Sequence, residues 1–474
     1  MTRHVLHRRV WAAVSIGALS ACASYDLHQG LKDIDKQTQV LTQKPLQLAT
    51  SAHDRQERER VASDTLAKPL DQQAAVRLML ANSPAFQALL AQHWSNAAVA
   101  AQSGRIGNPM FSFERMVTGP ERELTRFLSF GLLDVLTLPA RSSIAEQRVS
   151  LAQLEFAGEV VDQVTAVRLA WIDAVGAQQS LAYARQVYGV AEAGADLAKR
   201  MEAVGNFNRL TRARHQATYA EAGVSLVLAE QQAQAKREAL VRRLGLDDAQ
   251  AKRLQLPGRL PPLPDQPLST QQVAQRLSQD RLDVQQAKAQ WHAAARAQGL
   301  ADMTSLIDVE MTLIRPTTSE AGGEVSRSRG YEVGISLPVF DSGDLKRQAM
   351  SARALAAANV LESTLRAAGS HVRESYVAYR SAYDISRQFR DELLPLQQTI
   401  ADENVLRYNG MIIGVFELIA GARQQINVVR SAIDAQQQFW RADAALQASL
   451  MGRPAGVSLS SVAGGASDAA SGGH

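Results

Sequence analysis

The chain has 474 residues, with 51 lysine and arginine residues against 47 aspartate and glutamate residues, and a formal net charge of +4. Three of the arginines lie in the first 21 residues, which contain no acidic residue, so the remaining chain has a net charge of +1. The positive charge therefore comes largely from the first 21 residues and gives no reason to expect a nucleic-acid partner, and a single cysteine excludes a disulfide within the chain.

The N-terminal segment has the pattern of a secretory signal peptide. Arginines precede a short apolar stretch, residues 10–19, and small residues follow it up to Cys22. The stretch is too short to span a bilayer. Leu19-Ser20-Ala21-Cys22 resembles a bacterial lipobox, which predicts cleavage after residue 21 and lipidation of Cys22. The alternative is a plain signal peptide with an incidental cysteine. Ala23, rather than Asp, follows the cysteine and favours an outer-membrane location.

Two pairs of segments predict β-strands. In the second half, residues 307–313 and 331–337 alternate apolar and polar side chains, with a loop expected over 316–330. In the first half, residues 111–114 and 127–130 show a weaker version of the pattern. Such strands fit either a small soluble sheet or a membrane barrel with a lipid face and a water-filled lumen, and we favour the barrel. Since four strands cannot close a barrel, several chains would have to share one.

A long helical run follows each pair of strands. Residues 140–203 contain no proline, and residues 344–407 contain only Pro395, which would kink the run or break it in two. Sixty helical residues give a rod of about 90 Å. Shorter helices return over 210–244 and 415–450, so two antiparallel hairpins are expected. Apolar residues at spacings of three and four predict a coiled-coil-like seam: Leu154, Val161, Val164, Val167, Trp171 and Val175.

The order of these features repeats with an offset of about 200 residues, which indicates an internal duplication. Trp94 and Trp291 are 197 residues apart, and Pro139 and Pro338 are 199 apart. The predicted organisation is a signal peptide (1–21), a lipidated N-terminal linker (22–69), a first repeat (70–250), a Pro-rich linker (251–268), a second repeat (269–450) and a disordered tail (451–474).

The sequence lacks the motifs of common enzymes and metal sites. It has no His-Glu-x-x-His, no cysteine pair, no phosphate-binding glycine loop and no Gly-x-Ser-x-Gly. His93 and His292 each stand beside a tryptophan and are interpreted as helix-face residues rather than ligands. We therefore expect no enzyme, no metal and no cofactor.

Short motifs in both halves resemble the TolC family of outer-membrane efflux proteins, specifically the lipoprotein branch that serves RND-type pumps. The similarity covers residues 70 to 450, and its motifs are Asn82-Ser83-Pro84, Gln102-Ser103-Gly104, Asn108-Pro109, Leu282–Ala287, Val333–Gly343, Arg407–Gly410 and Phe416–Ile419. The resemblance implies a mainly helical chain with membrane strands. Four strands per chain would contribute to a trimeric, twelve-stranded β-barrel above a long antiparallel α-helical barrel. It also implies a homotrimer that contacts outer-membrane lipid, a periplasmic adaptor (membrane fusion) protein and an inner-membrane pump.

The resemblance also assigns roles to residues at the two hairpin turns. Residues at these periplasmic tips would dock the adaptor: Gly205, Asn206, Tyr408, Asn409, Gly410 and Gly414. Their glycines can take the left-handed conformations that a tight turn needs, and turn geometry alone is the alternative reading of Gly205, Gly410 and Gly414. Glu417 occupies the position of a gate acid, and three copies would form a ring that favours cations. The second acid position is Ala420, which departs from the family pattern, and a solvated helix-start glutamate is the alternative reading of Glu417.

Three functions remain open at this stage. The first is a passive exit duct of a tripartite efflux system, which conducts small molecules or metal ions from the periplasm to the exterior. The second is a structural coiled-coil outer-membrane lipoprotein without channel activity. The third, a periplasmic lipoprotein enzyme, lacks a catalytic constellation.

Overall fold

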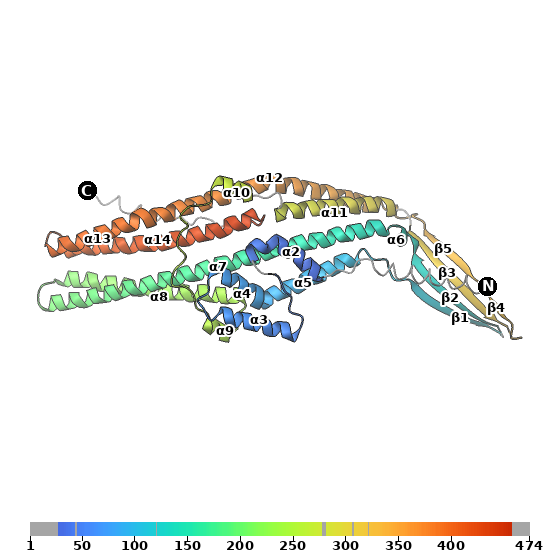
Figure 1. Cartoon of the computed structure of the whole chain (residues 1–474), viewed down its shortest axis with the longest axis horizontal. Helices are drawn as coiled ribbons and strands as arrows, with labels where there is room; N and C mark the ends of the chain where they lie inside the picture. The colour runs from blue at the N-terminus through green and yellow to red at the C-terminus, as the bar shows by residue number, and fades with distance from the viewer. Residues whose placement is uncertain are drawn as a thin grey trace. The chain divides into compact units, whose positions relative to one another are not determined.

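The computed structural model describes residues 27–42, 45–119, 121–276, 281–305, 308–320 and 322–456. The predicted signal peptide, Cys22 and most of the predicted tail lie outside the described residues. Figure 1 shows long helices and one sheet, which confirms the predicted fold class. No described helix is both long enough and apolar enough to cross a membrane.

The order of elements repeats along the chain, as the sequence predicts. The first half contains α2 (Leu27–Thr42), α3 (Ala52–Thr65), α4 (Gln72–Asn82), α5 (Pro84–Gln102), β1 (Met110–Thr118), β2 (Glu121–Gly131), α6 (Leu132–Leu136), α7 (Leu138–Ala203), α8 (Arg209–Leu244) and α9 (Asp248–Arg253). The second half contains α10 (Thr270–Arg276), α11 (Leu282–Thr304), β3 (Asp308–Ser319), β4 (Val325–Arg327), β5 (Gly330–Ser336), α12 (Asp344–Gln388), the π-helical segment η1 (Phe389–Leu393), α13 (Leu394–Asn409) and α14 (Val415–Leu450). Each half therefore has a helix, antiparallel strands, a long helix and a returning helix.

The chain forms two compact units. The sheet unit combines Ala91–Phe156 and Asp283–Arg366 with the described residues before Asp35. The hairpin unit combines Asp35–Leu90 and Ala157–Leu282 with the described residues from Ala367 onward. Both units draw on both halves of the chain.

The sheet is antiparallel and four strands wide, with β2 and β3 in the middle. β1 pairs with β2, β2 with β3, and β3 with both β4 and β5 along different stretches. The sequence predicts a loop over 316–330, but β3 continues to Ser319 and β4 forms inside this segment. Thr317 pairs with Leu124 on one side and Arg327 on the other, and β-branched threonines suit such an extended ribbon.

The predicted seam of the first long helix is buried at every position named for it. In the hairpin unit, Val161, Val164, Val167 and Val175 have no exposed surface, and Trp171 is 2% exposed. The Trp171 indole N–H donates to the backbone carbonyl of Leu70, 2.7 Å away. Apolar burial thus fixes which face of α7 is inside, while the indole hydrogen bond satisfies the one polar group that the seam buries.

The Asn82-Ser83-Pro84 motif holds the start of the first repeat to the end of its helical hairpin. Gly245 ends α8 in a left-handed conformation, with φ of 66°. A Cβ atom at Gly245 would lie 2.7 Å from Pro84 and from Ser83, so only glycine fits. The Asn82 side chain donates to the Gly245 carbonyl at 2.9 Å and to the Gln250 side chain at 3.1 Å.

Helices also form in the predicted N-terminal linker and at the boundary between the first repeat and the Pro-rich linker. In the predicted N-terminal linker, α3 begins with a capping box between Ser51 and Asp54. In the segment after the first hairpin, α9 begins with a capping box between Asp247 and Gln250. Reciprocal caps of this kind satisfy the free N–H groups of the first helical turn, so short polar sequences form helices there.

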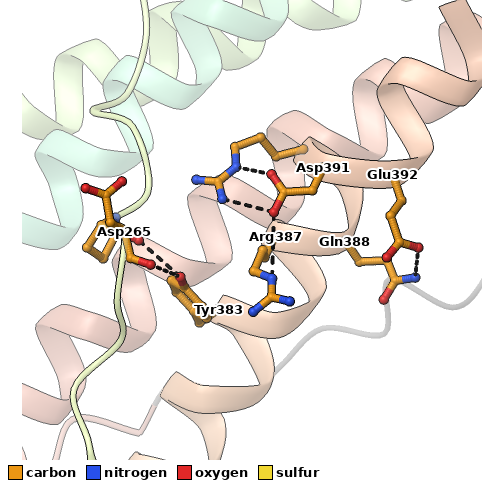
Figure 2. A network of polar contacts seen from close by, with 8 residues as sticks. Asp265, Tyr383, Arg387, Gln388, Asp391 and Glu392 are labelled. Atoms are coloured by element: carbon orange, nitrogen blue, oxygen red, sulfur yellow. Dashed lines mark hydrogen bonds and ion pairs between the residues drawn. The ribbon is translucent and has the colours of Figure 1, made fainter.

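The second long helix passes Pro395 without ending. Leu394 donates its N–H to the carbonyl of Phe389, five residues back, and the helix widens into η1. Pro395 has no N–H to donate to Asp391, and a wider turn accommodates its ring. Figure 2 shows Asp391 held between two arginines at this turn, with Arg390 Nε 2.6 Å and Arg387 Nε 3.7 Å from its carboxylate.

The Pro-rich linker is tied to the second hairpin by aromatic side chains. The Tyr383 hydroxyl donates to the carbonyls of Pro264 and Asp265, each at 3.1 Å (Figure 2). The Trp440 indole N–H donates to the Pro261 carbonyl at 3.0 Å. Tyr379, Tyr383 and Phe439 are buried beneath the linker. The linker therefore covers an aromatic core rather than hanging free.

Candidate functional site

The two faces of the sheet carry charges of opposite sign. The register places directly paired residues on the same face, and successive residues on opposite faces. All six acidic residues of the strands share one face, the acidic face: Glu114, Glu121, Glu123, Asp308, Glu310 and Glu332. All five strand arginines lie on the other, the arginine face: Arg115, Arg122, Arg126, Arg315 and Arg327.

Apolar side chains dominate the arginine face nearest the helices. One row of paired residues runs Phe111, Leu128, Leu313 and Tyr331, and a second runs Phe130, Met311 and Val333. The acidic face at the same level is more polar, since Ser129 and Thr312 form a direct hydroxyl hydrogen bond of 2.9 Å. The sheet is therefore amphipathic, and it leaves much of its apolar face uncovered in a single chain.

The turn between α7 and α8 contains the predicted tip residues Gly205 and Asn206. Gly205 has φ of 80°, and the Asn206 N–H donates to the Met201 carbonyl at 2.9 Å. With the Gly205 N–H donating to the Glu202 carbonyl, this is a Schellman motif. The Asn208 side chain then caps α8 by accepting from the Thr211 N–H at 2.8 Å. The turn is compact, and Gly205 and Asn206 are exposed.

The turn between α13 and α14 has the same hydrogen-bond pattern, but a different residue type occupies its left-handed position. The Ile412 N–H donates to the Arg407 carbonyl and the Met411 N–H to the Tyr408 carbonyl, which is again a Schellman motif. The left-handed residue is Met411, with φ of 58°, and not a glycine. Gly410 and Gly414 do not use the left-handed freedom of glycine, because their φ angles are −78° and −81°.

The remaining predicted tip residues flank this second turn. Tyr408 and Asn409 end α13 and are exposed, and Glu417 lies in the first turn of α14 with its side chain exposed. Its N–H donates to the Gly414 carbonyl at 3.1 Å. Ala420, one turn later, is also exposed, so Glu417 has no acidic neighbour at that position.

A bond that the sequence does not suggest joins the two hairpins. Arg423 on α14 donates to the Thr218 hydroxyl at 2.8 Å and to the Glu221 carboxylate at 2.9 Å, both on α8. All three residues belong to the hairpin unit, whose two turns lie at the same end in Figure 1. No local pattern marks these residues, which are about 200 positions apart in the chain.

Among the described residues, no group of three or more His, Cys, Asp and Glu side chains is placed to hold a metal ion. His93 is buried on α5, where its ring stacks on Phe156 with centroids 4.5 Å apart. Burial lowers the pKa of His93 to about 4, while a hydrogen bond with the Ala152 backbone opposes the shift. This histidine is a neutral packing residue.

No protein-family model matches the sequence, and no curated protein sequence matches it. Solved structures do match the fold. The Campylobacter jejuni outer membrane channel CmeC is 12% identical with a TM-score of 0.65, and the match covers 83% of this chain and 85% of CmeC. The Vibrio cholerae outer membrane protein VceC is 16% identical with a TM-score of 0.65, covering 84% of this chain and 96% of VceC. The open-state Neisseria gonorrhoeae outer membrane channel MtrE is 17% identical with a TM-score of 0.61, covering 83% of this chain and 88% of MtrE.

These similar structures are described as outer-membrane proteins or channels. The similarity spans more than four fifths of the chain in each case. The chain therefore has the fold of the TolC-type outer-membrane channels.

Proposed function

We propose that this chain is one subunit of a homotrimeric outer-membrane exit duct. The duct passively conducts small molecules or metal ions from the periplasm to the exterior, while docked to a periplasmic adaptor and an inner-membrane pump. The observation that carries the proposal is the segregation of charge between the two faces of a sheet whose edges are open.

The apolar rows of the arginine face favour contact with lipid. Rows such as Leu128–Leu313 and Met311–Val333 are stable against lipid, whereas the carboxylates of the acidic face need water. Strand edges with free backbone groups are not tolerated in hydrocarbon, so β1 and β5 must pair with strands of other chains. Three sheets of four strands give a closed barrel of twelve, wide enough for a water-filled lumen.

The acidic face suits a lumen that favours cations. Six carboxylates per chain share it, and it has no strand arginine or lysine. Copies of Glu417 from three subunits would add a carboxylate ring at the periplasmic gate. The exposed turn residues Gly205, Asn206, Tyr408, Asn409, Gly410 and Gly414 would contact the adaptor, and acyl chains on Cys22 would anchor each subunit to the outer membrane.

The first experiment measures the native mass of the full-length protein in detergent, followed by conductance in a planar bilayer of neutral lipid. We expect three chains per particle and discrete channel openings. A stable monomer without conductance would leave the sheet edges unpaired and would favour the structural lipoprotein without channel activity. A trimer without conductance would refute the duct while leaving the assembly intact.

The anchor has a separate test. Replacing Cys22→Ser removes the sulfur that the lipid would modify. We expect the variant to lose incorporation of labelled palmitate and still to contain three chains per particle, because the barrel strands hold the trimer together. Palmitate incorporation that survives the substitution would refute lipidation at Cys22.

A further inference from the structure

The arginine face has two zones along the strand direction. Near the helices it is apolar, through the rows that contain Leu128 and Met311. Toward the β1–β2 turn it carries Arg126 opposite Arg315, then Arg115 and Arg327 in the next row, then Arg122. Rows on one face are about 7 Å apart, so five guanidinium groups fall within roughly 15 Å of strand.

These arginines have no acidic partners in the described part of the chain. Among the residues that the structure describes, their one side-chain hydrogen bond runs from Arg126 Nη1 to the Thr317 hydroxyl, at 3.4 Å. Arg126 and Arg315 are a directly paired cross-strand couple, and like charges in such positions repel each other. The acidic residues of the strands, such as Glu123 and Glu114, are all on the opposite face. An anion from outside the chain would relieve this repulsion.

We propose that the five arginines bind the phosphate groups of an acidic membrane lipid whose acyl chains cover the adjacent apolar rows. Guanidinium groups bind phosphate through two parallel hydrogen bonds, which suits a charged headgroup at the membrane surface. The partner must carry phosphate and hydrocarbon together, because Arg126–Arg315 and Leu128–Leu313 are neighbouring rows on one face. A free anion would leave the apolar rows exposed. The inference rests on the proposed function in one respect, namely that this face meets the membrane.

The test uses the full-length protein in neutral detergent and counts bound lipids by native mass spectrometry. The probes are lipid A and, for comparison, phosphatidylcholine, which has a phosphate but no net charge. We expect the wild-type protein to retain lipid A preferentially. The double variant Arg126→Gln/Arg315→Gln should weaken that binding on the order of tenfold to thirtyfold, since each arginine near an anionic surface contributes about 1 kcal/mol.

The control variant is Arg353→Gln/Arg366→Gln, which removes the same charge from exposed positions on α12. It should bind lipid A as the wild type does. A second variant, Arg126→Lys/Arg315→Lys, keeps the charge but cannot form bidentate hydrogen bonds with phosphate. We expect it to bind lipid A with an affinity between those of the wild type and Arg126→Gln/Arg315→Gln. Each variant must show the wild-type native mass, which separates loss of binding from misfolding.

Three outcomes would overturn the inference: equal retention of lipid A and phosphatidylcholine, unchanged lipid A binding in Arg126→Gln/Arg315→Gln, or complete displacement of lipid A by inorganic phosphate at matched phosphate concentration. The last would identify a free-anion site. Conductance of the wild type in neutral lipid is recorded in parallel. A conducting trimer without lipid preference refutes only this inference, whereas a non-conducting protein refutes the proposed duct.

Discussion

Single residues show how burial and backbone strain act in this chain. His93 is 4% exposed and stacks on Phe156, and its pKa of about 4 lies below the ordinary value of 6.5 because charging the ring would cost solvation. The unfolded chain therefore binds this proton more readily than the folded one. The contribution of His93 to the free energy of unfolding is therefore fully present above pH 6.5 and is lost as the pH falls toward 4.

We expect His93→Phe to flatten this pH dependence. The substitution keeps a ring against Phe156 but removes the titrating group. Between pH 6.5 and pH 4, the free energy of unfolding should therefore fall by up to about 3 kcal/mol less in the variant than in the wild type. Denaturant titrations across this range measure it. The control is His292→Phe, at an exposed position on α11. An unchanged slope in His93→Phe would show that other groups cause the acid sensitivity.

Met411 is a strained residue at the second hairpin turn. It is 93% exposed and has the left-handed backbone that Gly205 takes in the first turn. A left-handed conformation costs a residue with a Cβ atom about 1 kcal/mol.

Met411→Gly should therefore raise the free energy of unfolding of the hairpin by about 1 kcal/mol, and Gly205→Ala should lower it by a similar amount. Hydrogen exchange of the amides that close the two turns reports the change locally. The matched control is Ile412→Gly, which removes a neighbouring exposed side chain without relieving a left-handed backbone. A gain in Ile412→Gly equal to that in Met411→Gly would contradict the strain explanation.

At the scale of elements, one carboxylate links three long helices. Asp173 on α7 accepts from Lys236 Nζ of α8 at 2.9 Å and from Arg441 Nε of α14 at 2.7 Å. The Gln437 side chain donates to the same carboxylate at 3.3 Å. The Asp173 side chain is only 19% exposed, so water cannot readily replace these hydrogen bonds.

Asp173→Asn should lower the free energy of unfolding on the order of 2 kcal/mol, because two cations lose their counter-charge in a mostly buried position. The control is Glu230→Gln, which breaks the exposed pair with Arg185 and should cost under about 0.5 kcal/mol. Urea titration monitored by circular dichroism compares them. Equal losses in the two variants would show that burial does not distinguish these ion pairs.

At the scale of the whole molecule, the sorting of charge in the sheet decides what the proposed lumen prefers. The variant Glu114→Gln/Glu123→Gln/Glu310→Gln removes half of the carboxylates on the acidic face. We expect a severalfold lower ratio of cation to anion permeability, measured from the reversal potential in a salt gradient. The control is Glu57→Gln, at an exposed position on α3. An unchanged ratio in the triple variant would place the selective region elsewhere, with Glu417 the next residue to test.

Local patterns in the sequence determined the elements. Alternation from 307 to 313 and 331 to 337 located strands, and the three-four spacing that includes Val164 and Trp171 located the buried face of α7. Such periodicity depends only on residues that are close in the sequence, so it can be recognised without knowledge of the fold. The hairpin turns were located by the glycines at which the helical runs break, near Gly205 and Gly410.

Only the tertiary structure decided which residues meet. The register that pairs Arg126 with Arg315 joins strands from different halves of the chain, and the Arg423–Glu221 bond joins two hairpins. A shift of one residue between β2 and β3 would have placed Arg122 and Arg126 on the same face as the acidic residues of β3, and no local pattern fixes that choice. The register between strands of different halves is set by the closure of long loops and by the burial of apolar surface across the whole molecule. For this reason the sequence predicted the strands but not the sorting of their charges.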